Sequence, residues 1–134
     1  MERRDVAASL AAGRVAIGVV ALLAPAFVSR IMIPRDGSGD GTTLFARMVG
    51  ARDLGLGLGL LIALDRGAPV RGWLEASAVV DGIDAAACLL ARDHIRTSVL
   101  PGAVGLAAAG ALLSGWLAQQ LDPVPPPQSA QPGQ

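Results

Sequence analysis

Residues 97–121 read TSVLPGAVGLAAAGALLSGWLAQQL and contain no formally charged side chain. As a helix, this segment is longer than the roughly 30 Å of hydrocarbon in a bilayer. Three earlier apolar stretches are of similar length, but each carries charged residues near its middle. The sequence therefore predicts an all-α fold, a four-helix transmembrane bundle with short loops and helices at about residues 6–33, 43–64, 69–91 and 98–119.

Composition agrees with a membrane protein of one domain. Hydrophobic residues make up 52% and charged residues 16% of the 134 residues, and the mean hydropathy is +0.51. An average soluble domain has about 25% charged residues. The net charge is zero and basic residues form no cluster, which argues against a nucleic-acid partner. We expect a membrane domain over residues 1–121 and a disordered tail over 122–134, which holds five of the nine prolines.

Turn residues and prolines predict where the helices begin and end. Pro25 should kink or end the first helix, because proline lacks the amide hydrogen that an inner helical position requires. Thr42 or Thr43 is a candidate N-cap of the second helix. Pro69 suits the first turn of the third helix, and the fourth should start or bend near Pro101.

The N-terminus partly imitates a secretory signal. Two arginines, an apolar run and Ala24-Pro-Ala26 are followed, however, by further apolar residues up to Ile33, so we expect the segment to remain uncleaved.

Arginines are evenly divided between the two predicted faces of the membrane. The first helix usually dominates orientation, which favours a multi-pass protein of a bacterial inner membrane with both termini in the cytoplasm.

Charged residues inside the predicted spans are the candidate functional residues. An isolated charge at the centre of a bilayer costs about 3 kcal/mol even on the mildest scale, so these side chains should neutralise one another. The predicted buried charge cluster comprises Arg14, Arg47, Arg52, Asp53, Glu75, Asp81 and Asp84.

Matching depths predict the pairs within this cluster. At about 1.5 Å per residue from the link between the second and third helices, Arg52 and Asp81 both lie roughly 18 Å deep. The same count favours pairing Arg47 with Asp84 and Arg14 with Glu75, while Arg71 can also reach Glu75 at i,i+4. Three arginines face four acids, so one carboxyl should be neutral at pH 7. Asp53 and Asp81 are the candidates for that neutral group.

Two functions fit such a cluster. Buried ion pairs can fix the register and pairing of helices, or acids inside the membrane can form a proton or ion pathway. The structural role is favoured because the charges nearly balance and their depths coincide. The predicted function is therefore a non-enzymatic accessory or oligomeric membrane subunit, and the alternative is a small proton- or ion-coupled transporter that uses the second and third helices.

Small residues recur every fourth position and predict close helix packing. Ala51, Gly55 and Gly59 do so in the second helix, and Gly105 with Ala109 in the fourth. Such steps let helix backbones approach closely in lipid. The glycines do not form a dinucleotide-binding motif, because no strand precedes them and their spacing differs from Gly-x-Gly-x-x-Gly.

Other chemistry has few candidate residues. The chain has one histidine and one cysteine, too few for a usual zinc site, and we expect no metal and no cofactor. Asp81 and Asp84 could hold a divalent cation on one helix face, although pairing with arginine is favoured. A third function is a membrane enzyme acting on a hydrophobic substrate, with Asp81 or Glu75 as its general acid or base.

The segment Arg47-Met-Val-Gly-Ala-Arg-Asp-Leu-Gly-Leu-Gly resembles a stretch in small uncharacterised bacterial four-helix membrane proteins. In that group Arg-x-x-Gly-Ala-Arg-Asp-x-x-Leu-Gly opens the second helix, and acids lie in the third. The resemblance implies the four-helix architecture and no particular activity. Expected partners are the lipid bilayer and either further copies of the chain or another membrane protein.

Overall fold

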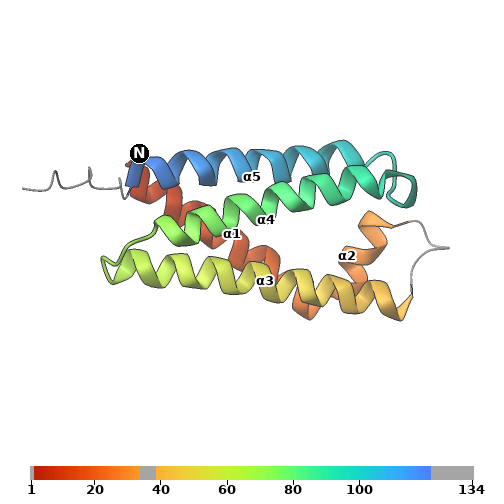
Figure 1. The fold of residues 1–134 in the computed structure, drawn as a ribbon. Helices are drawn as coiled ribbons and strands as arrows, with labels where there is room; N and C mark the ends of the chain where they lie inside the picture. The colour runs from red at the N-terminus through yellow and green to blue at the C-terminus, as the bar shows by residue number, and fades with distance from the viewer. Residues whose placement is uncertain (1, 34–38, 122–134) are drawn as a thin grey trace, which may run out of the picture.

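The computed structural model describes residues 2–33 and 39–121, and the regular structure in these two ranges is entirely helical. The four long helices lie side by side (Figure 1), and they are α1 (Arg3–Leu23), α3 (Asp40–Asp65), α4 (Arg71–Leu90) and α5 (Leu100–Leu121). A short helix, α2 (Pro25–Met32), follows α1, and the 3-10 turn η2 (Arg92–His94) precedes α5. The all-α prediction is confirmed, whereas the predicted tail lies outside the described residues.

The first predicted helix is two helices. Ala24 leaves helical geometry, with φ −127° and ψ 52°, and Pro25 begins α2. Proline fits there because the first residues of a helix have no amide partner within that helix. The expected effect of Pro25 is thus confirmed. Helix α2 then packs on α3, where the Ser29 hydroxyl donates a hydrogen bond to the Thr42 carbonyl oxygen at 3.2 Å.

The predicted helix starts differ from the observed ones by two or three residues. The N-cap of α3 is Gly39, and Thr42 lies three residues later, where its Oγ1 accepts a hydrogen bond from the Gly39 amide at 3.1 Å. Helix α4 begins at Arg71, so Pro69 lies before its first turn. Pro101 does lie in the first turn of α5, as predicted.

The link between α3 and α4 is a tight turn centred on Gly67. This residue has φ +63°, the left-handed conformation that glycine adopts at little cost. The Ala68 amide donates to the Ala63 carbonyl oxygen at 2.9 Å, and the Gly67 amide donates to Leu64. This Schellman arrangement satisfies carbonyl groups at the end of α3 and reverses the chain into α4.

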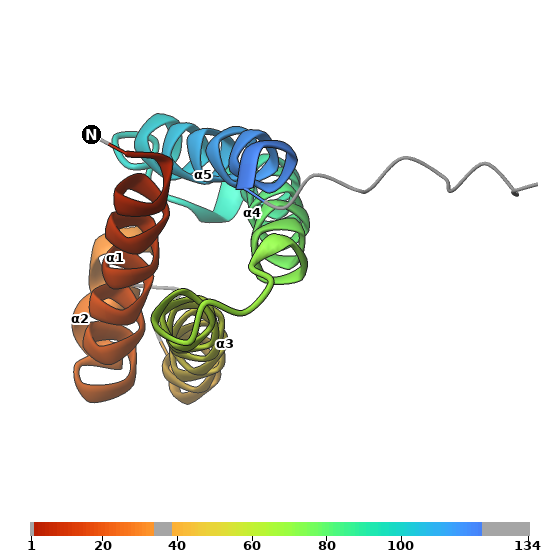
Figure 2. The ribbon, with the colours of Figure 1, turned by 90° about the vertical axis from the view of Figure 1, so that its left-hand side faces the viewer.

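The long helices associate as two pairs. Helix α1 makes its most extensive contacts with α3, and α4 makes its own with α5, while the α3–α4 and α1–α5 contacts are much smaller. Figure 2 shows the four helices end-on, with the two pairs facing each other. The contacts that hold the α1–α3 pair against the α4–α5 pair are therefore central to the fold.

The α1–α3 seam is built mainly from small residues that recur every three or four positions. On α1 the buried residues are Ala7, Ala11, Arg14, Gly18 and Ala21. On α3 they are Ala46, Gly50, Asp53, Gly57, Leu60 and Ala63. A Cβ added to Gly18 would lie 2.7 Å from the Gly50 carbonyl oxygen, so the two backbones are nearly in contact there.

Only one of the three glycines predicted to pack helices does so. Gly59 lies against the ring of Trp73 on α4, with no room for a Cβ. Gly55 and Gly105 are exposed, and no described atom outside their own helix comes within 4 Å of a Cβ placed on either. That prediction was wrong within the chain, because the four-residue stripe through Ala51 and Gly55 points away from α1.

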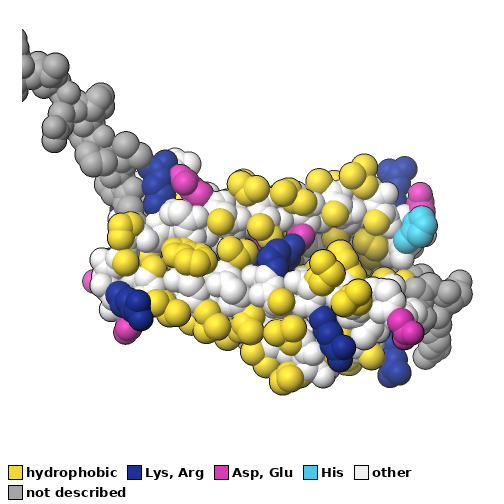
Figure 3. All heavy atoms as spheres, turned by 60° about the horizontal axis from the view of Figure 1, so that its bottom comes forward, with side chains coloured by type: hydrophobic (Ala, Val, Ile, Leu, Met, Phe, Trp, Pro, Cys, Tyr) yellow, Lys and Arg dark blue, Asp and Glu magenta, His cyan; other side chains and the backbone are white. Residues whose placement is uncertain are grey.

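Large apolar side chains lie outside the bundle and small ones inside. The exterior carries leucine, isoleucine, phenylalanine and tryptophan side chains, whereas six of the ten buried hydrophobic residues are alanines. Figure 3 shows a face covered by apolar side chains, with charged side chains mostly near its two ends and a group of both signs midway. Among the described residues, α1 and α5 are each long and apolar enough to cross a membrane.

Arginines tie the helices together at both ends of the bundle. At the end that holds the N-terminus, an Arg4 guanidinium nitrogen donates to the Leu64 carbonyl oxygen at 3.2 Å. At the opposite end, Arg96 donates from its backbone amide to Met32 and from Nε to the Ile33 carbonyl oxygen at 3.2 Å. Both contacts satisfy carbonyl groups at helix C-termini, where positive charge is favourable.

Candidate functional site

Arg14 of α1 is buried where the two helix pairs meet. Its side chain is 7% exposed. Nη1 donates to Asp53 Oδ1 at 3.1 Å, and Nη2 donates to Asp81 Oδ2. Nη2 also lies 3.5 Å from the Ser77 carbonyl oxygen. One guanidinium thus contacts α3 within its own pair and α4 of the opposite pair, a geometry that suits the planar fork of arginine.

Arg52 forms the second bridge between the pairs. Its Nη1 and Nη2 donate to the two carboxylate oxygens of Asp84 at 2.8 and 2.7 Å, a bidentate arrangement between α3 and α4. Nη2 also donates to Asp53 Oδ1 at 3.3 Å. Bidentate pairs between ionised groups are among the strongest hydrogen bonds in proteins. This bridge is more open than the first, since the Arg52 and Asp84 side chains are 30% and 33% exposed.

Together these contacts form one chain of alternating charge, which we call the charge network. In order of contact it runs Asp81, Arg14, Asp53, Arg52, Asp84. The network joins α4 to α1, α1 to α3, and α3 back to α4. It therefore connects the two helix pairs near the middle of the bundle, whereas the buried apolar cluster shared by the four long helices lies nearer the α3–α4 link.

Helix α5 closes the network on its fourth side. The Asp81 carboxylate lies directly against Gly110, where a Cβ would overlap an oxygen of that carboxylate. Ser77, one turn before Asp81 on α4, and Ser114, one turn after Gly110 on α5, are both fully buried. Asp81 is thus enclosed by the α5 backbone and by Arg14.

Three of the predicted ion pairs are wrong and one is confirmed. Arg52 pairs with Asp84 instead of Asp81, and Arg14 pairs with Asp53 and Asp81 instead of Glu75. The Arg71–Glu75 pair forms within α4 at 2.6 Å. A residue's place in the sequence gives its depth along the bundle, but the rotation of each helix about its axis decides which side chains face each other.

Arg47 shows the effect of rotation most clearly. It precedes Arg52 by five residues, which places it about 140° around the helix. Its side chain is exposed, and it forms no ion pair with any carboxylate in residues 2–33 or 39–121. Arg47 and Glu75 therefore lie outside the network, and the other five predicted members of the cluster lie within it.

The charge network and its surroundings contain one excess carboxyl group and several polar atoms without a hydrogen-bond partner among the described residues. Two guanidinium groups meet three carboxyl groups, so full ionisation would leave one negative charge without a partner. The prediction that Asp53 or Asp81 is neutral stays a prediction. Four buried polar atoms make no hydrogen bond within the described chain: Nε of Arg14 and Arg52, and the hydroxyls of Ser77 and Ser114.

The remaining candidate chemistry is dispersed. Within the described ranges, no three histidine, cysteine, aspartate or glutamate side chains come together as metal ligands. Asp81 and Asp84 are each taken by an arginine from another helix. Glu75 is exposed at the start of α4 beside Arg71, and His94 is exposed in η2.

Sequence reasoning missed the glycines that position the network. Gly18 and Gly50 allow α1 and α3 to approach closely one turn from Arg14 and Asp53, and Gly110 makes room for Asp81. The available signal was the alternating spacing of small residues through Arg14 and through Asp53, which marks each charge as the centre of a buried stripe.

Comparison with family models, with curated proteins and with solved structures gives no match.

Proposed function

We propose that this chain is an integral membrane protein whose four long helices all cross the bilayer, and that it acts as a non-enzymatic accessory or oligomeric subunit. In this proposal the charge network holds the α1–α3 and α4–α5 pairs together. The resemblance to small bacterial four-helix membrane proteins points the same way. A bacterial inner membrane, with both termini in the cytoplasm, is the location that we propose.

The observation that carries the proposal is that the charges of α3 and α4 meet one another within a bundle whose exterior is apolar. Isolated charges would keep these two helices out of lipid. Paired as Arg52 with Asp84, and with Asp53 and Asp81 on Arg14, they offer a largely neutral interior. Large exposed apolar side chains on all four helices support the same placement.

A charge exchange tests this role. Either single variant, Arg52→Asp or Asp84→Arg, places like charges opposite each other. Each should greatly lower the fraction of protein that stays in the membrane after alkaline extraction. The double exchange should restore most of it. The matched control is the exposed pair Arg92 and Asp93 at 3.9 Å, where single exchanges should have little effect. Wild-type protein that is monomeric in the aqueous fraction without detergent would contradict the proposal.

A second candidate is a proton- or ion-coupled carrier, and the excess carboxyl of the network favours it. A group that shares charge among three acids and two arginines can take up and release a proton. The unsatisfied hydroxyls of Ser77 and Ser114 offer hydrogen bonds beside Asp81.

Proton flux into proteoliposomes separates the two candidates. For a carrier, Asp81→Asn should fold and insert normally but lose flux, while the exposed Asp93→Asn retains it. If the wild-type protein gives no more proton flux than empty vesicles, the carrier is excluded and the structural role is retained.

A further inference from the structure

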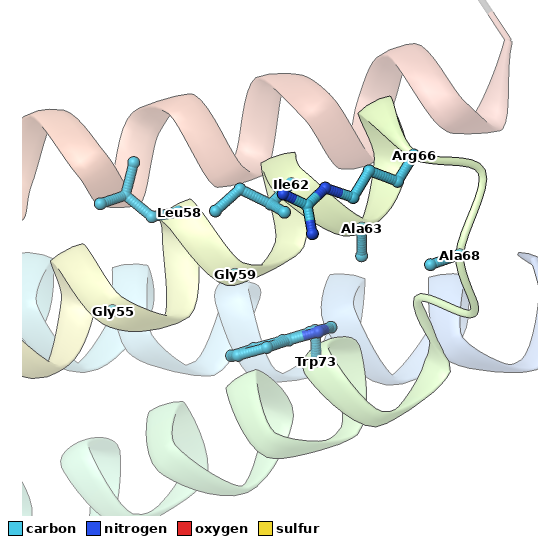
Figure 4. A pocket seen from close by; sticks show the side chains of 8 residues that line it. All are labelled: Gly55, Leu58, Gly59, Ile62, Ala63, Arg66, Ala68 and Trp73. Atoms are coloured by element: carbon cyan, nitrogen blue, oxygen red, sulfur yellow. The ribbon is translucent and has the colours of Figure 1, made fainter.

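An apolar groove opens to the outside between α3 and α4, near the link that joins them (Figure 4). Its volume is about 460 Å³, and it is open along one side. The side chains and glycines that matter here are Gly55, Leu58, Gly59, Ile62, Arg66 and Trp73. Apart from Arg66, they are apolar.

The groove exists because one face of α3 lacks side chains. Gly59 accepts the Trp73 ring of α4, and Gly55, one turn further along α3, has open space where a side chain would be. The same face carries Arg52 one turn beyond Gly55. The groove thus runs from the end of the bundle inward along α3 as far as Gly55.

Arg66 places one positive charge at the outer end of the groove. Its side chain runs back along α3, and its guanidinium lies beside Ile62 on the wall opposite Trp73 (Figure 4). It forms no ion pair with a carboxylate in the described ranges. As the C-cap residue of α3, Arg66 lies at the end of the bundle, the depth of lipid headgroups if the bundle spans the membrane.

We propose that the groove binds one acyl chain of an anionic phospholipid and that Arg66 binds its phosphate. This inference rests on the proposed membrane insertion. A long apolar floor with a single cation at its headgroup end complements a lipid, which has its own negative charge at one end. Tryptophan at this level is also typical of contact with the lipid interface.

Lipid binding to the detergent-purified full chain tests the charge. Native mass spectrometry with added phosphatidylglycerol should show a first lipid bound more tightly than phosphatidylcholine. Arg66→Gln should weaken that first phosphatidylglycerol about fivefold, the effect of one basic contact with an anionic headgroup. Arg92→Gln, an exposed arginine at the opposite end, is the control and should change it little. Equal binding by wild type and Arg66→Gln would overturn the proposal.

The groove itself is tested by filling it. Gly55→Leu places a side chain in the open groove, whereas Gly105→Leu adds the same side chain to an equally open position on α5. The first should abolish the preferred phosphatidylglycerol and the second should not. Because neither position meets a described neighbour, this pair also decides the matter if Arg66→Gln fails to fold.

A brominated acyl chain locates the lipid directly. Trp73 and Trp116 are the two tryptophans, so Trp116→Phe leaves Trp73 as the sole fluorophore. In vesicles, brominated phosphatidylglycerol should quench Trp73 more than brominated phosphatidylcholine does, and Gly55→Leu should remove the difference. Equal quenching by both lipids would refute the site and leave membrane insertion standing, whereas protein that stays in the aqueous fraction would refute insertion itself.

Discussion

At the scale of single residues, Arg14 is the most deeply buried arginine of the charge network and contacts two carboxylates. Its guanidinium serves two carboxylates and lies beside a backbone carbonyl while almost wholly enclosed. Removing one partner of a buried ion pair leaves an uncompensated charge, which costs more than the pair contributes in net stability. The residue is thus important chiefly because Asp53 and Asp81 are already in place.

We expect Arg14→Met to destabilise the protein by about 3–5 kcal/mol, because Asp81 would remain buried without a cation and Asp53 would keep only Arg52. Unfolding in mixed detergent micelles measures this free energy. Arg47→Met, the same substitution at an exposed position, should change it by less than about 0.5 kcal/mol. Equal unfolding midpoints for the two variants would show that the network does not support the fold.

At the scale of elements, the α1–α3 pair depends on glycines that leave no space between two backbones. A Cβ on Gly18 would lie 2.6 Å from the Leu54 amide nitrogen, which belongs to a rigid helix and cannot move alone. Gly50 and Gly57 face α1 in the same way. Any side chain at these positions must push the helices apart, and this also separates Arg14 from Asp53.

Gly18→Ala should therefore destabilise the protein by about 1–3 kcal/mol through overpacking. Gly13→Ala lies on the same helix, where a Cβ meets nothing within 4 Å, and should be neutral or stabilising by up to about 1 kcal/mol because alanine favours helices. Thermal unfolding in detergent compares them. A Gly18→Ala variant as stable as Gly13→Ala would contradict the close approach.

The α3–α4 link depends on the positive φ of Gly67. Gly67→Ala should cost about 1–2 kcal/mol, because a Cβ is disfavoured in the left-handed region. Gly72→Ala, five residues later in an open position of α4, is the control and should not destabilise. Chemical unfolding curves for the two variants should separate, and coincident curves would count against this turn geometry.

At the scale of the whole molecule, the distribution of side chains is the reverse of that in a soluble bundle. The apolar core contains mainly alanines and a few leucines, while large apolar side chains cover the surface. Small residues inside and large ones outside are what helices packed in lipid require. The N-terminus, the α3–α4 link and the end of α5 lie at one end (Figure 1), so the proposed topology places all three in the cytoplasm.

Cysteine labelling tests that topology. In a Cys88→Ser background, which removes the only natural cysteine, Asp93→Cys should react with a membrane-impermeant maleimide in intact bacteria whose outer membrane has been permeabilised. Asp65→Cys, the last residue of α3 and at the other end of the bundle from Asp93, should react only after the inner membrane is opened. The reverse pattern would invert the topology, and labelling of both in intact cells would exclude the crossing of α4.

Much of the fold could be predicted from local sequence, but little of the pairing could. Long apolar stretches and Pro25 are local signals that hold whatever the tertiary packing, and the all-helical fold followed from them. The charge pairs could not be predicted in this way. Whether two side chains meet depends on their depth along the bundle and also on their direction around each helix axis, and the sequence gives only the depth. Gly55 shows the same limit: it shares a stripe with Gly59, which packs on Trp73 of α4, but Gly55 itself faces the open groove.

Local sequence patterns are enough to show that the chain is helical, to place its helices within a few residues, and to require partners for the charges inside apolar segments. These are consequences of hydrogen bonding, side-chain geometry and the cost of burying charge, which act over one or two turns. That Arg14 joins Asp53 to Asp81, and that Arg52 pairs with Asp84, follows from the tertiary packing alone. Partner choice depends on how each helix is rotated about its axis, and the close contact of Gly18 with Gly50 and the space at Gly110 set that rotation.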